Sequence, residues 1–510
     1  MAALEQAIRA EALKLIRRHE LYARWAADES RRRQRRVSVP LPRLEVRRPN
    51  YWKWAGGFDP YLARSKAATT GHSIRRALRS DRYAPRSPAG YEVPKADGGQ
   101  RIVSVFQVAD NAVSSIVFKS LMEKNRGKMS GRAYAYRPDL TAHDALQFMQ
   151  TEFGASNRLF VAEYDFSKYF DSIDQDYIWR TLTDGRYLMT RSERRVISAF
   201  LQAPLPKTDG SAYAEFCEDS RDRGVPQGTS ISLFLANLAA APLDRELERH
   251  GVGFVRYADD TLLWSTDYAT LGRAVEVLHR VASDIGADIN QTKSGGIRIL
   301  VPKGAEAEFR HKPYVEFVGY QVGLTELNMK PDAAERIKAR LRELMFTNLL
   351  MPVHDRTIDA GRLSGKVDKD YVVFIWQARR FLYGDLSEQE LRRFQSRGAP
   401  MRRFKGVMSY YPLVEDGAAL LQLDQWFSSQ VWLTMRRRER LLNAAGFTAL
   451  PPPLGLDRKT LIAYRRTSAS TGGTLDLRLP SFRRIANVIR SAAVAHGPNR
   501  IGKSPSAYDY

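Results

Sequence analysis

Two β-prone runs that flank a pair of acids, within residues 254–264, constrain this chain more than any other feature of its sequence. The segment reads Phe-Val-Arg-Tyr-Ala-Asp-Asp-Thr-Leu-Leu-Trp. Apolar runs on both sides of a short polar step are typical of a β-hairpin. We therefore expect a hairpin that carries Asp259 and Asp260 at its tip. Because acids are also common in ordinary polar turns, this segment alone identifies no chemistry.

A third acid, Asp165, follows an apolar run of its own. Residues 159–164 read Leu-Phe-Val-Ala-Glu-Tyr, and a helix-like segment begins just after Asp165. We expect a strand that ends at Asp165, where α/β sheets often hold their chemistry. The alternative is that Asp165 is the N-cap of the helix that follows.

Asp165, Asp259 and Asp260 are expected to converge at one site. Carboxylates that lie close together raise one another's pKa, and a bound divalent cation removes that cost. Hard oxygen ligands suit Mg²⁺ that is bound together with substrate phosphates. Two such ions, about 3.5–4 Å apart, activate a 3′ hydroxyl and neutralise a leaving pyrophosphate. The three acids therefore predict nucleotidyl transfer.

The charge balance indicates a polyanionic partner. The chain has 80 Lys and Arg against 57 Asp and Glu, a net charge of +23. Nucleic acid is the first expectation and a membrane surface the second. No apolar run approaches the roughly 20 residues of a membrane-spanning helix, so we expect no membrane partner. The single cysteine, Cys217, allows neither an intrachain disulfide nor a multi-cysteine zinc site. Together with the lack of an export signal, it favours the cytoplasm.

The pattern along the chain predicts an α/β part followed by an all-α part. Short β-rich runs alternate with amphipathic helices over residues 91–325, and the pattern is mostly helical from about 330 onward. Residues 1–28 are predicted to form a helix. The very basic segment from Ser30 to Arg48 is either a solvated tether or a nucleic-acid-binding arm.

Seven segments, in order along the chain, resemble the motifs of reverse transcriptases. The acids belong to two of them, since Tyr257-Ala258-Asp259-Asp260 resembles the Tyr-x-Asp-Asp box and Asp165 with Phe170 resembles the first palm motif. The other five lie at 93–101, 130–134, 223–237, 290–293 and 316–320. They resemble the fingers motif, the block that follows it, the Pro-Gln-Gly motif, the Asn-x-x-Lys element and the primer-grip hairpin. The resemblance covers roughly residues 50–330.

This resemblance implies a right-hand polymerase with a ferredoxin-like palm sheet and a helical thumb. Residues 1–49 would form a basic N-terminal helix and arm. The remaining parts would be fingers at 50–155, palm with some fingers elements at 156–328, thumb at 329–450, and a C-terminal extension without an assigned role at 451–510.

The resemblance also implies roles for the acids and their neighbours. Asp165 and Asp259 would be the main ligands of two Mg²⁺ ions, with help from the backbone carbonyl of Phe166. Asp260 would belong to the same metal site through its charge. The ring of Phe170 would lie under the sugar and exclude a 2′ hydroxyl, which favours DNA synthesis over RNA synthesis. The alternative for Phe170 is an ordinary core aromatic.

Five further residues are implied to contact the substrates. Lys95 and Arg101 would clamp the triphosphate, unless they are simply solvated surface cations. Gln227 and Gly228 would lie near the template–nucleotide pair. Lys293 would donate a proton to pyrophosphate, and its alternative is a surface lysine.

The wording of the palm, with Thr-Ser-Ile-Ser at 229–232 and Ala-Asn at 236–237, resembles the bacterial "unknown group" reverse transcriptases of the group II intron and retron-like lineage. These include defence-associated and abortive-infection enzymes. We therefore expect antiphage cDNA synthesis on an associated non-coding RNA. The expected partners are the RNA template, the DNA product and deoxynucleoside triphosphates, and formation of a homo-oligomer is left open.

Three alternatives stay open. Tyr508 and Tyr510, at the end of the chain, are candidate protein primers, although a disordered tail is the more common reason for such an ending. The same metal site would serve a template-independent polymerase. A function of another class is a maturase-like RNA-binding protein that has kept the fold without catalysis.

Overall fold

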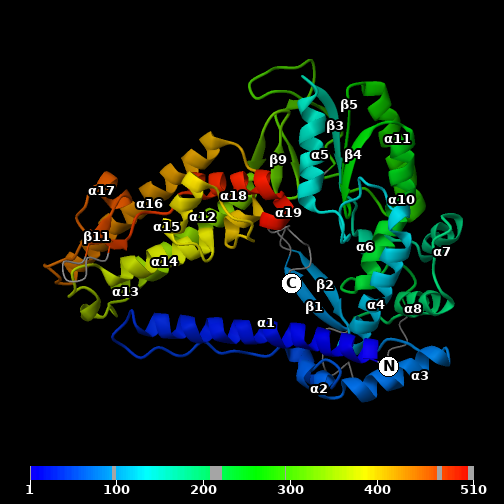
Figure 1. Ribbon diagram of the computed structural model, residues 1–510, viewed down its shortest axis with the longest axis horizontal. Helices are drawn as coiled ribbons and strands as arrows, with labels where there is room; N and C mark the ends of the chain where they lie inside the picture. The colour runs from blue at the N-terminus through cyan, green and yellow to red at the C-terminus, as the bar shows by residue number, and fades with distance from the viewer. Residues whose placement is uncertain (1, 95–98, 207–220, 293, 468–473, 503–510) are drawn as a thin grey trace. The chain divides into compact units, whose positions relative to one another are not determined.

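The structure is a computed structural model that describes residues 2–94, 99–206, 221–292, 294–467 and 474–502 (Figure 1). The chain forms two compact units. Unit 1 contains residues 1–25, 45–140 and 156–312, and unit 2 contains residues 26–44, 141–155 and 313–510. Each unit is therefore built from segments that are separated in the sequence.

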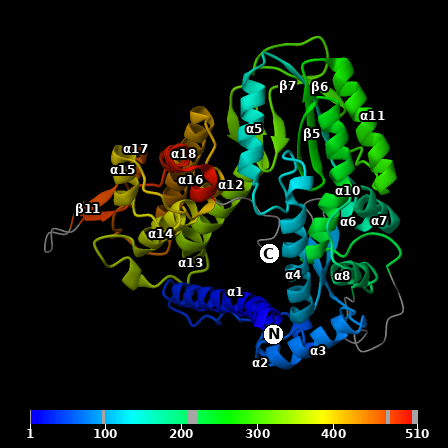
Figure 2. The ribbon, with the colours of Figure 1, turned by 45° about the vertical axis from the view of Figure 1, so that its right-hand side comes forward.

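A five-stranded sheet is the centre of unit 1, and its strand order is β4-β5-β3-β6-β7 (Figures 1 and 2). The strands are β3 (Leu159–Tyr164), β4 (Gly253–Tyr257), β5 (Asp260–Ser265), β6 (Ile297–Leu300) and β7 (His311–Lys312). Strand β3 pairs antiparallel with both β5 and β6, and five of its six residues are buried. The run predicted to be a strand before Asp165 is thus the middle of the sheet.

The expected ferredoxin-like palm sheet is present. The chain runs through β3, α10 (Ser230–Arg249), β4, β5, α11 (Tyr268–Ile285) and β6, which is a split βαββαβ arrangement with β3 between β5 and β6. Both helices begin at a side-chain cap, since Thr229 accepts from the Ser232 amide and Asp267 from the Thr270 amide. This confirms the predicted fold class, a mixed sheet followed by a helical region.

The rest of unit 1 is a β-hairpin surrounded by helices. The hairpin consists of β1 (Ala89–Pro94) and β2 (Gln100–Val105), paired from Ala89–Val105 to Pro94–Gln100. The helices are η1 (Asn50–Lys53), α2 (Pro60–Ser65), α3 (Ala67–Arg79), α4 (Val108–Asn125), η2 (Arg126–Lys128), α6 (Tyr169–Ser172), α7 (Gln175–Asp184) and α8 (Arg191–Leu201). The first part of α1 also packs into this core.

The basic N-terminal segment is more ordered than expected. Helix α1 runs from Ala2 to Gln34, past the predicted end at residue 28, and its last turn carries three arginines. Arg31 pairs with Asp28, while Arg32 and Arg33 pair with Glu29. Two residues further on, the side chain of Arg36 is buried. Residues 30–34 belong to α1 and are therefore no tether, although Arg31 and Arg35 remain exposed to solvent. Both alternatives for residues 35–48 stay predictions.

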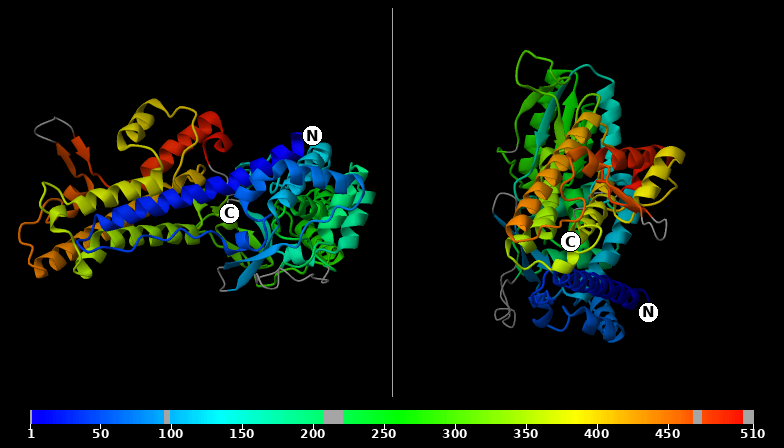
Figure 3. Two further views of the ribbon diagram at one scale, coloured as in Figure 1. Left: turned by 90° about the horizontal axis from the view of Figure 1, so that it is seen from below. Right: turned by 90° about the vertical axis from the view of Figure 1, so that its left-hand side faces the viewer.

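Unit 2 is mostly helical, as the pattern after residue 330 predicts (Figure 3). Its helices are α5 (Ala142–Gly154), α12 (Pro331–Met345), η3 (Phe346–Leu350), α13 (Met351–His354), η4 (Ala360–Arg362), α14 (Lys369–Tyr383), α15 (Glu388–Arg397), η5 (Val407–Tyr410), α16 (Gly417–Ala444), α17 (Arg458–Ile462), α18 (Phe482–His496) and α19 (Pro498–Ile501). Within the described ranges, no helix of the chain combines the length and apolarity needed to cross a bilayer.

Two small sheets complete unit 2. Strands β8 (Val315–Phe317), β9 (Tyr320–Val322) and β10 (Leu327–Met329) form an antiparallel meander, and β11 (Arg465–Thr467) pairs with β12 (Thr474–Asp476). The turn between β8 and β9 has positive φ at both Val318 (41°) and Gly319 (85°), as a type I′ hairpin requires. The segment that resembles a primer grip is thus a tight hairpin.

A buried ionic cluster ties the helices of unit 2 together. Arg438 on α16 is fully buried and bonds Asp368 at 2.8 Å and Asp370 at 2.8 Å. Arg362 bonds the other oxygen of Asp370 at 2.5 Å. Burial is the largest influence on Asp370 and raises its pKa. Because these charges are removed from water, each depends on its partners.

Candidate active site

Sheet register brings the three predicted acids to one end of the palm sheet. Tyr164 on β3 is paired with Thr261 on β5, and Tyr257 on β4 is paired with Asp260. One step beyond the Tyr164–Thr261 pair, Asp165 comes opposite Asp260. Residues that lie opposite each other on antiparallel strands point to the same face. Asp165, Asp259 and Asp260 are each partly exposed, so a substrate has access to their carboxylates.

The tip of the β4–β5 hairpin has a strained backbone. Tyr257 and Asp260 form its last pair, which leaves Ala258 and Asp259 as the two turn residues. Ala258 has φ +62°, a conformation that costs a residue with a Cβ atom about 1 kcal/mol or more. A positive φ at the first turn position is the pattern of a type II′ hairpin. Asp259 thus lies on a turn that its surroundings must hold in place.

The buried guanidinium of Arg256 holds this turn. Its Nη1 donates to the carbonyl of Ala258 at 2.9 Å and to Oδ1 of Asn237 at 3.1 Å. Its Nε and Nη2 bond the two carboxylate oxygens of Asp244 at 2.7 and 2.6 Å. Burial would lower the pKa of Arg256, but the charge and hydrogen bonds of Asp244 raise it overall. Helix α10 therefore fixes the acidic turn from inside the protein.

The segment before Lys293 is joined to Asp165 through the backbone. The amide of Asn290 donates to the carbonyl of Asp165 at 2.8 Å, and the amide of Ser167 donates to the carbonyl of Asp288 at 2.7 Å. This pairing places the Asn-x-x-Lys element beside the first acid. Lys293 itself lies outside the described residues, so its predicted role stays a prediction.

Asp165 is not the N-cap of a helix. Strand β3 ends at Tyr164, and the next helix, α6, begins only at Tyr169 after Lys168. The backbone of residues 166–167 instead continues toward residues 288–289, with Phe166 bridged to Ile289. The alternative structural explanation for Asp165, an N-cap, is therefore wrong.

The Pro-Gln-Gly turn contacts both Phe170 and the β1–β2 hairpin. The amide of Val225 donates to the carbonyl of Phe170 at 2.7 Å, and the amide of Ser104 donates to the carbonyl of Gln227 at 2.7 Å. Gly228 has φ +113°, and a Cβ atom there would lie 2.4 Å from the carbonyl oxygen of Ser104. Glycine is thus required for the close approach of β2.

Phe170 is half-buried between two tyrosines. Its ring centre lies 6.3 Å from that of Tyr136 and 6.1 Å from that of Tyr169, edge-on to both. The hydroxyl of Tyr169 donates to the carbonyl of Ala236 at 2.8 Å, which anchors α6 on α10. Its partial exposure distinguishes Phe170 from a fully buried core aromatic, and its role toward the sugar stays a prediction.

The remaining predicted residues are only partly described. Arg101 is exposed on β2, where it is paired with Val93. Lys95, Tyr508 and Tyr510 lie outside the described residues, as does Cys217. The expected triphosphate clamp by Lys95 and Arg101 therefore stays a prediction.

The donor set fits a hard divalent cation that is shared with a substrate. Carboxylate oxygens and the Phe166 carbonyl are the ligand types that Mg²⁺ prefers. Among the described residues, no three His, Cys, Asp or Glu side chains form a cluster that would enclose a metal by themselves. Such incomplete sites are usual where substrate phosphates supply further ligands.

A match to a protein family identifies the domain that contains this sheet. Residues 93–322 match the family model described as reverse transcriptase (RNA-dependent DNA polymerase). The chain carries a reverse transcriptase domain. The matched range runs from the end of β1 through β9 and contains the three acids, the Pro-Gln-Gly turn and the Arg256 network. Enzymes of this family are RNA-directed DNA polymerases that generally use divalent metals.

Known proteins that match part of this chain include a yeast intron protein and Candida telomerases. Over 156 residues the chain is 28% identical to the COX1/OXI3 intron 1 protein of Saccharomyces cerevisiae, which covers 31% of this chain and 18% of the yeast protein. Apo telomerase from Candida tropicalis without its C-terminal domain is 12% identical, with a TM-score of 0.37, and the match covers 52% of this chain and 60% of that one. Telomerase from Candida albicans, with a fragment of telomeric RNA, is 12% identical with a TM-score of 0.37, over 75% and 67%. This chain thus spans only part of these relatives.

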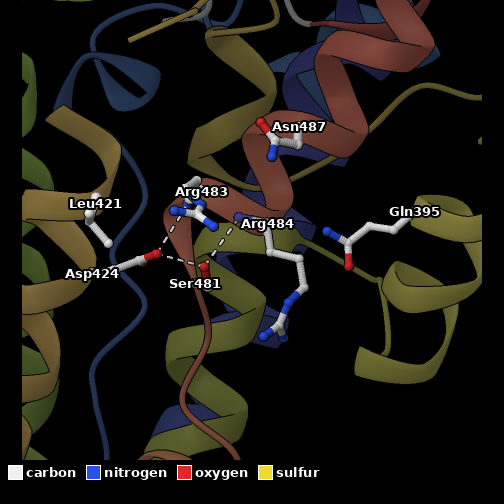
Figure 4. Close-up of a pocket in the computed structure, with 7 residues that line it drawn as sticks. All are labelled: Gln395, Leu421, Asp424, Ser481, Arg483, Arg484 and Asn487. Atoms are coloured by element: carbon white, nitrogen blue, oxygen red, sulfur yellow. Dashed lines mark hydrogen bonds between the residues drawn. The ribbon is translucent and has the colours of Figure 1, made fainter. Parts of the chain in front are cut away.

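Unit 2 contains a pocket of its own. It has a volume of about 300 Å³ and is lined by Gln395, Leu421, Asp424, Ser481, Arg483, Arg484 and Asn487 (Figure 4). Asp424 accepts from the hydroxyl of Ser481 at 2.7 Å and from the amide of Phe482 at 2.6 Å. The lining comes from α15, α16 and α18, and the carboxylate of Asp424 is engaged at the start of α18.

The sequence prediction missed the network around Arg256. Asp244, Asn237 and Arg256 are all buried, yet the motif comparison gave none of them a role. One signal was present, since a charged residue in the middle of an apolar strand must find a buried partner.

Proposed function

We propose that this chain copies RNA into DNA by nucleotidyl transfer at Asp165, Asp259 and Asp260, with Mg²⁺ as the metal. The observation that carries the proposal is the register that places Asp165 opposite Asp260 at the end of β3. When bound, Mg²⁺ would activate the primer hydroxyl and stabilise the charge that develops on the leaving pyrophosphate.

The chain's own residues would hold the reacting groups. Asp165, Asp259 and the Phe166 carbonyl would supply metal ligands, and Asp260 would add negative charge. Arg101 and Lys95 would bind the triphosphate, and Lys293 would protonate the leaving group. Gln227 and Gly228 would support the base pair that forms.

The direct test is primer extension on an RNA template with deoxynucleoside triphosphates and Mg²⁺. We expect extension by the wild-type protein and a loss of at least roughly a thousandfold in Asp259→Asn, since metal ligands contribute several kcal/mol to such reactions. Glu276→Gln is the matched control, because Glu276 is an exposed carboxylate in the middle of α11 and lies outside the motif segments. Equal rates in all three proteins would refute the catalytic assignment.

Sequencing the nucleic acid that co-purifies with the protein would identify the template. We propose an associated non-coding RNA, and the cDNA should be absent from the Asp259→Ala, Asp260→Ala double variant. DNA of arbitrary sequence would favour the template-independent alternative. A peptide–DNA linkage at Tyr508 or Tyr510 would favour protein priming. RNA without any DNA product would favour the maturase-like function.

We further propose that the enzyme acts in the cytoplasm in antiphage defence. The proposal is supported by the resemblance of residues 229–237 to defence-associated reverse transcriptases. Cells that express the wild-type chain should plate phage less efficiently than cells that express Asp259→Asn. Equal plating across a broad phage panel would dismiss the defence role and leave the polymerase activity untouched.

A further inference from the structure

Helix α1 carries a run of exposed residues between Lys14 and Trp25, after the turns that it buries in unit 1. Leu4, Ile8 and Ala12 recur every four residues and pack into the core. The turns that follow expose three cations and three large apolar residues at helical spacing. We name these residues the α1 stripe: Lys14, Arg17, Arg18, Leu21, Tyr22 and Trp25.

The cations of the α1 stripe are not neutralised. Within the described ranges, Lys14, Arg17 and Arg18 have no ion-pair partner, and Glu20 is the one acid that lies between them and Trp25. The last turn of the same helix differs, because Asp28 and Glu29 pair there with three arginines. The stripe therefore presents net positive charge to the solvent.

The aromatic part of the stripe is exposed and ordered. The rings of Tyr22 and Trp25 are stacked, with centres 5.7 Å apart and an interplanar angle of 24°. Leu21, Tyr22 and Trp25 are 66%, 47% and 46% exposed, which is unusual for such large apolar side chains. A hollow of about 510 Å³ runs along the helix beside Lys14, Arg17, Arg18 and Leu21.

We propose that the α1 stripe binds single-stranded RNA. Lys14, Arg17 and Arg18 contact phosphates, and the Tyr22–Trp25 pair stacks under bases. A membrane-bound helix would present a broader apolar face than three residues interrupted by cations. This inference rests on the proposed function, since it assigns a place outside residues 93–322 to the RNA that the enzyme copies or carries.

The test measures binding of a fluorescein-labelled U20 RNA to the full chain by anisotropy. Lys14→Gln, Arg17→Gln, Arg18→Gln should weaken binding at least tenfold. The dependence of log K on log salt should become shallower by about 2, because each single-strand phosphate contact contributes about 0.7. Tyr22→Ala, Trp25→Ala should also lose about tenfold, the value of one stacked base.

A matched control removes the same charge elsewhere in unit 1. Arg249→Gln, Lys303→Gln, Arg310→Gln alters three exposed cations away from α1 and should leave the affinity and the salt slope unchanged. In parallel, RNA with 4-thiouridine should crosslink to the peptide that contains Tyr22 and Trp25. Thermal melting verifies that all the variants are folded.

Equal RNA affinity in the stripe and control variants, without a crosslink on α1, would overturn the proposal. Loss of binding to anionic lipid vesicles with RNA affinity unchanged would overturn it too. Primer extension on a short template measures the polymerase activity independently of RNA binding by the stripe. If the protein extends the primer but the stripe variants bind RNA as well as the wild type, only this inference is refuted. If the stripe binds RNA but the protein does not extend the primer, only the proposed function is refuted.

Discussion

Gly228 is a residue that no other amino acid replaces without moving a strand. Its φ of +113° and the Ser104 carbonyl beside its Cβ position both disfavour any side chain at this residue. We expect Gly228→Ala to destabilise the protein by roughly 1–3 kcal/mol in urea unfolding. Gly272→Ala on α11 is the control, because nothing lies within 4 Å of its Cβ position, and it should stabilise by about 0.5–1 kcal/mol. Equal changes in the free energy of unfolding for the two variants would contradict the close approach of β2 to Gly228.

Phe170 carries the prediction of sugar selectivity. If its ring excludes a 2′ hydroxyl, Phe170→Ala should raise the ratio of ribonucleotide to deoxynucleotide kcat/KM by about 10- to 100-fold, the range of a steric pocket contact. Single-nucleotide extension measures both substrates. Tyr136→Phe, in the neighbouring ring, should leave the ratio unchanged. A lower rate with both substrates and no change in their ratio would show that Phe170 is only a packing residue.

At the scale of elements, Arg256 couples α10 to the β4–β5 turn. Arg256→Lys retains a charge but loses the bond to Ala258 and the fork to Asp244, so Asp259 loses its support. We expect kcat to fall by about 10- to 100-fold, with a smaller change in the KM for nucleotide. Asp244→Asn should lose less kcat, because the Arg256–Ala258 bond remains. Equal losses in the two variants, at a temperature where both are folded, would indicate a purely structural role.

Asp110 on α4 anchors the segment that precedes β1. Its carboxylate accepts from the hydroxyl of Tyr83 at 2.9 Å and from the amide of Arg86 at 3.1 Å. Burial raises the pKa of Asp110 to about 6, despite these bonds. Because the folded pKa lies above the unfolded value, Asp110 contributes stability at pH 4 that is lost as the pH rises through 6.

Asp110→Asn removes this titration. The free energy of unfolding of the wild type, relative to the variant, should fall by up to roughly 3 kcal/mol between pH 4 and pH 7. Urea unfolding of both proteins at several pH values measures this difference. A difference that is constant across the range would show that Asp110 does not titrate there.

Local patterns in the sequence predicted the palm well and its supports poorly. Asp165, Asp259 and Asp260 are found from runs of adjacent residues, and alternating apolar runs gave the strands around them. Arg256 and Asp244 were missed because their pairing depends on how α10 packs, which no short window contains. The place of α5 also depends on packing. The sequence assigned it to the fingers at 50–155, whereas in the structure it belongs to the compact unit 2. The functional boundaries of fingers, palm and thumb stay predictions.

At the scale of the whole molecule, the two units should respond separately to core changes. Arg438→Met leaves Asp368 buried without its cation and leaves Asp370 with Arg362 alone, which costs about 4 kcal/mol. Hydrogen exchange should show lost protection in unit 2 and retained protection in the palm sheet. Arg436→Met on the same helix breaks only the exposed pair with Glu439 and should cost less than about 1 kcal/mol. Uniform loss of protection across both units would show that they unfold together.

The interleaving of the two units matters for how the chain is made. Helix α5 leaves the ribosome long before the β8–β10 meander and the C-terminal helices that belong to the same unit, because residues 156–312 are translated in between. At a typical 5–20 residues per second, that delay is roughly 10–30 s. During it, the apolar side chains of Leu146, Met149 and Phe153, buried in the finished protein, have no native partners from the later part of unit 2. The nascent protein should therefore depend on chaperones at this stage, and a version cut at residue 312 would expose that surface permanently.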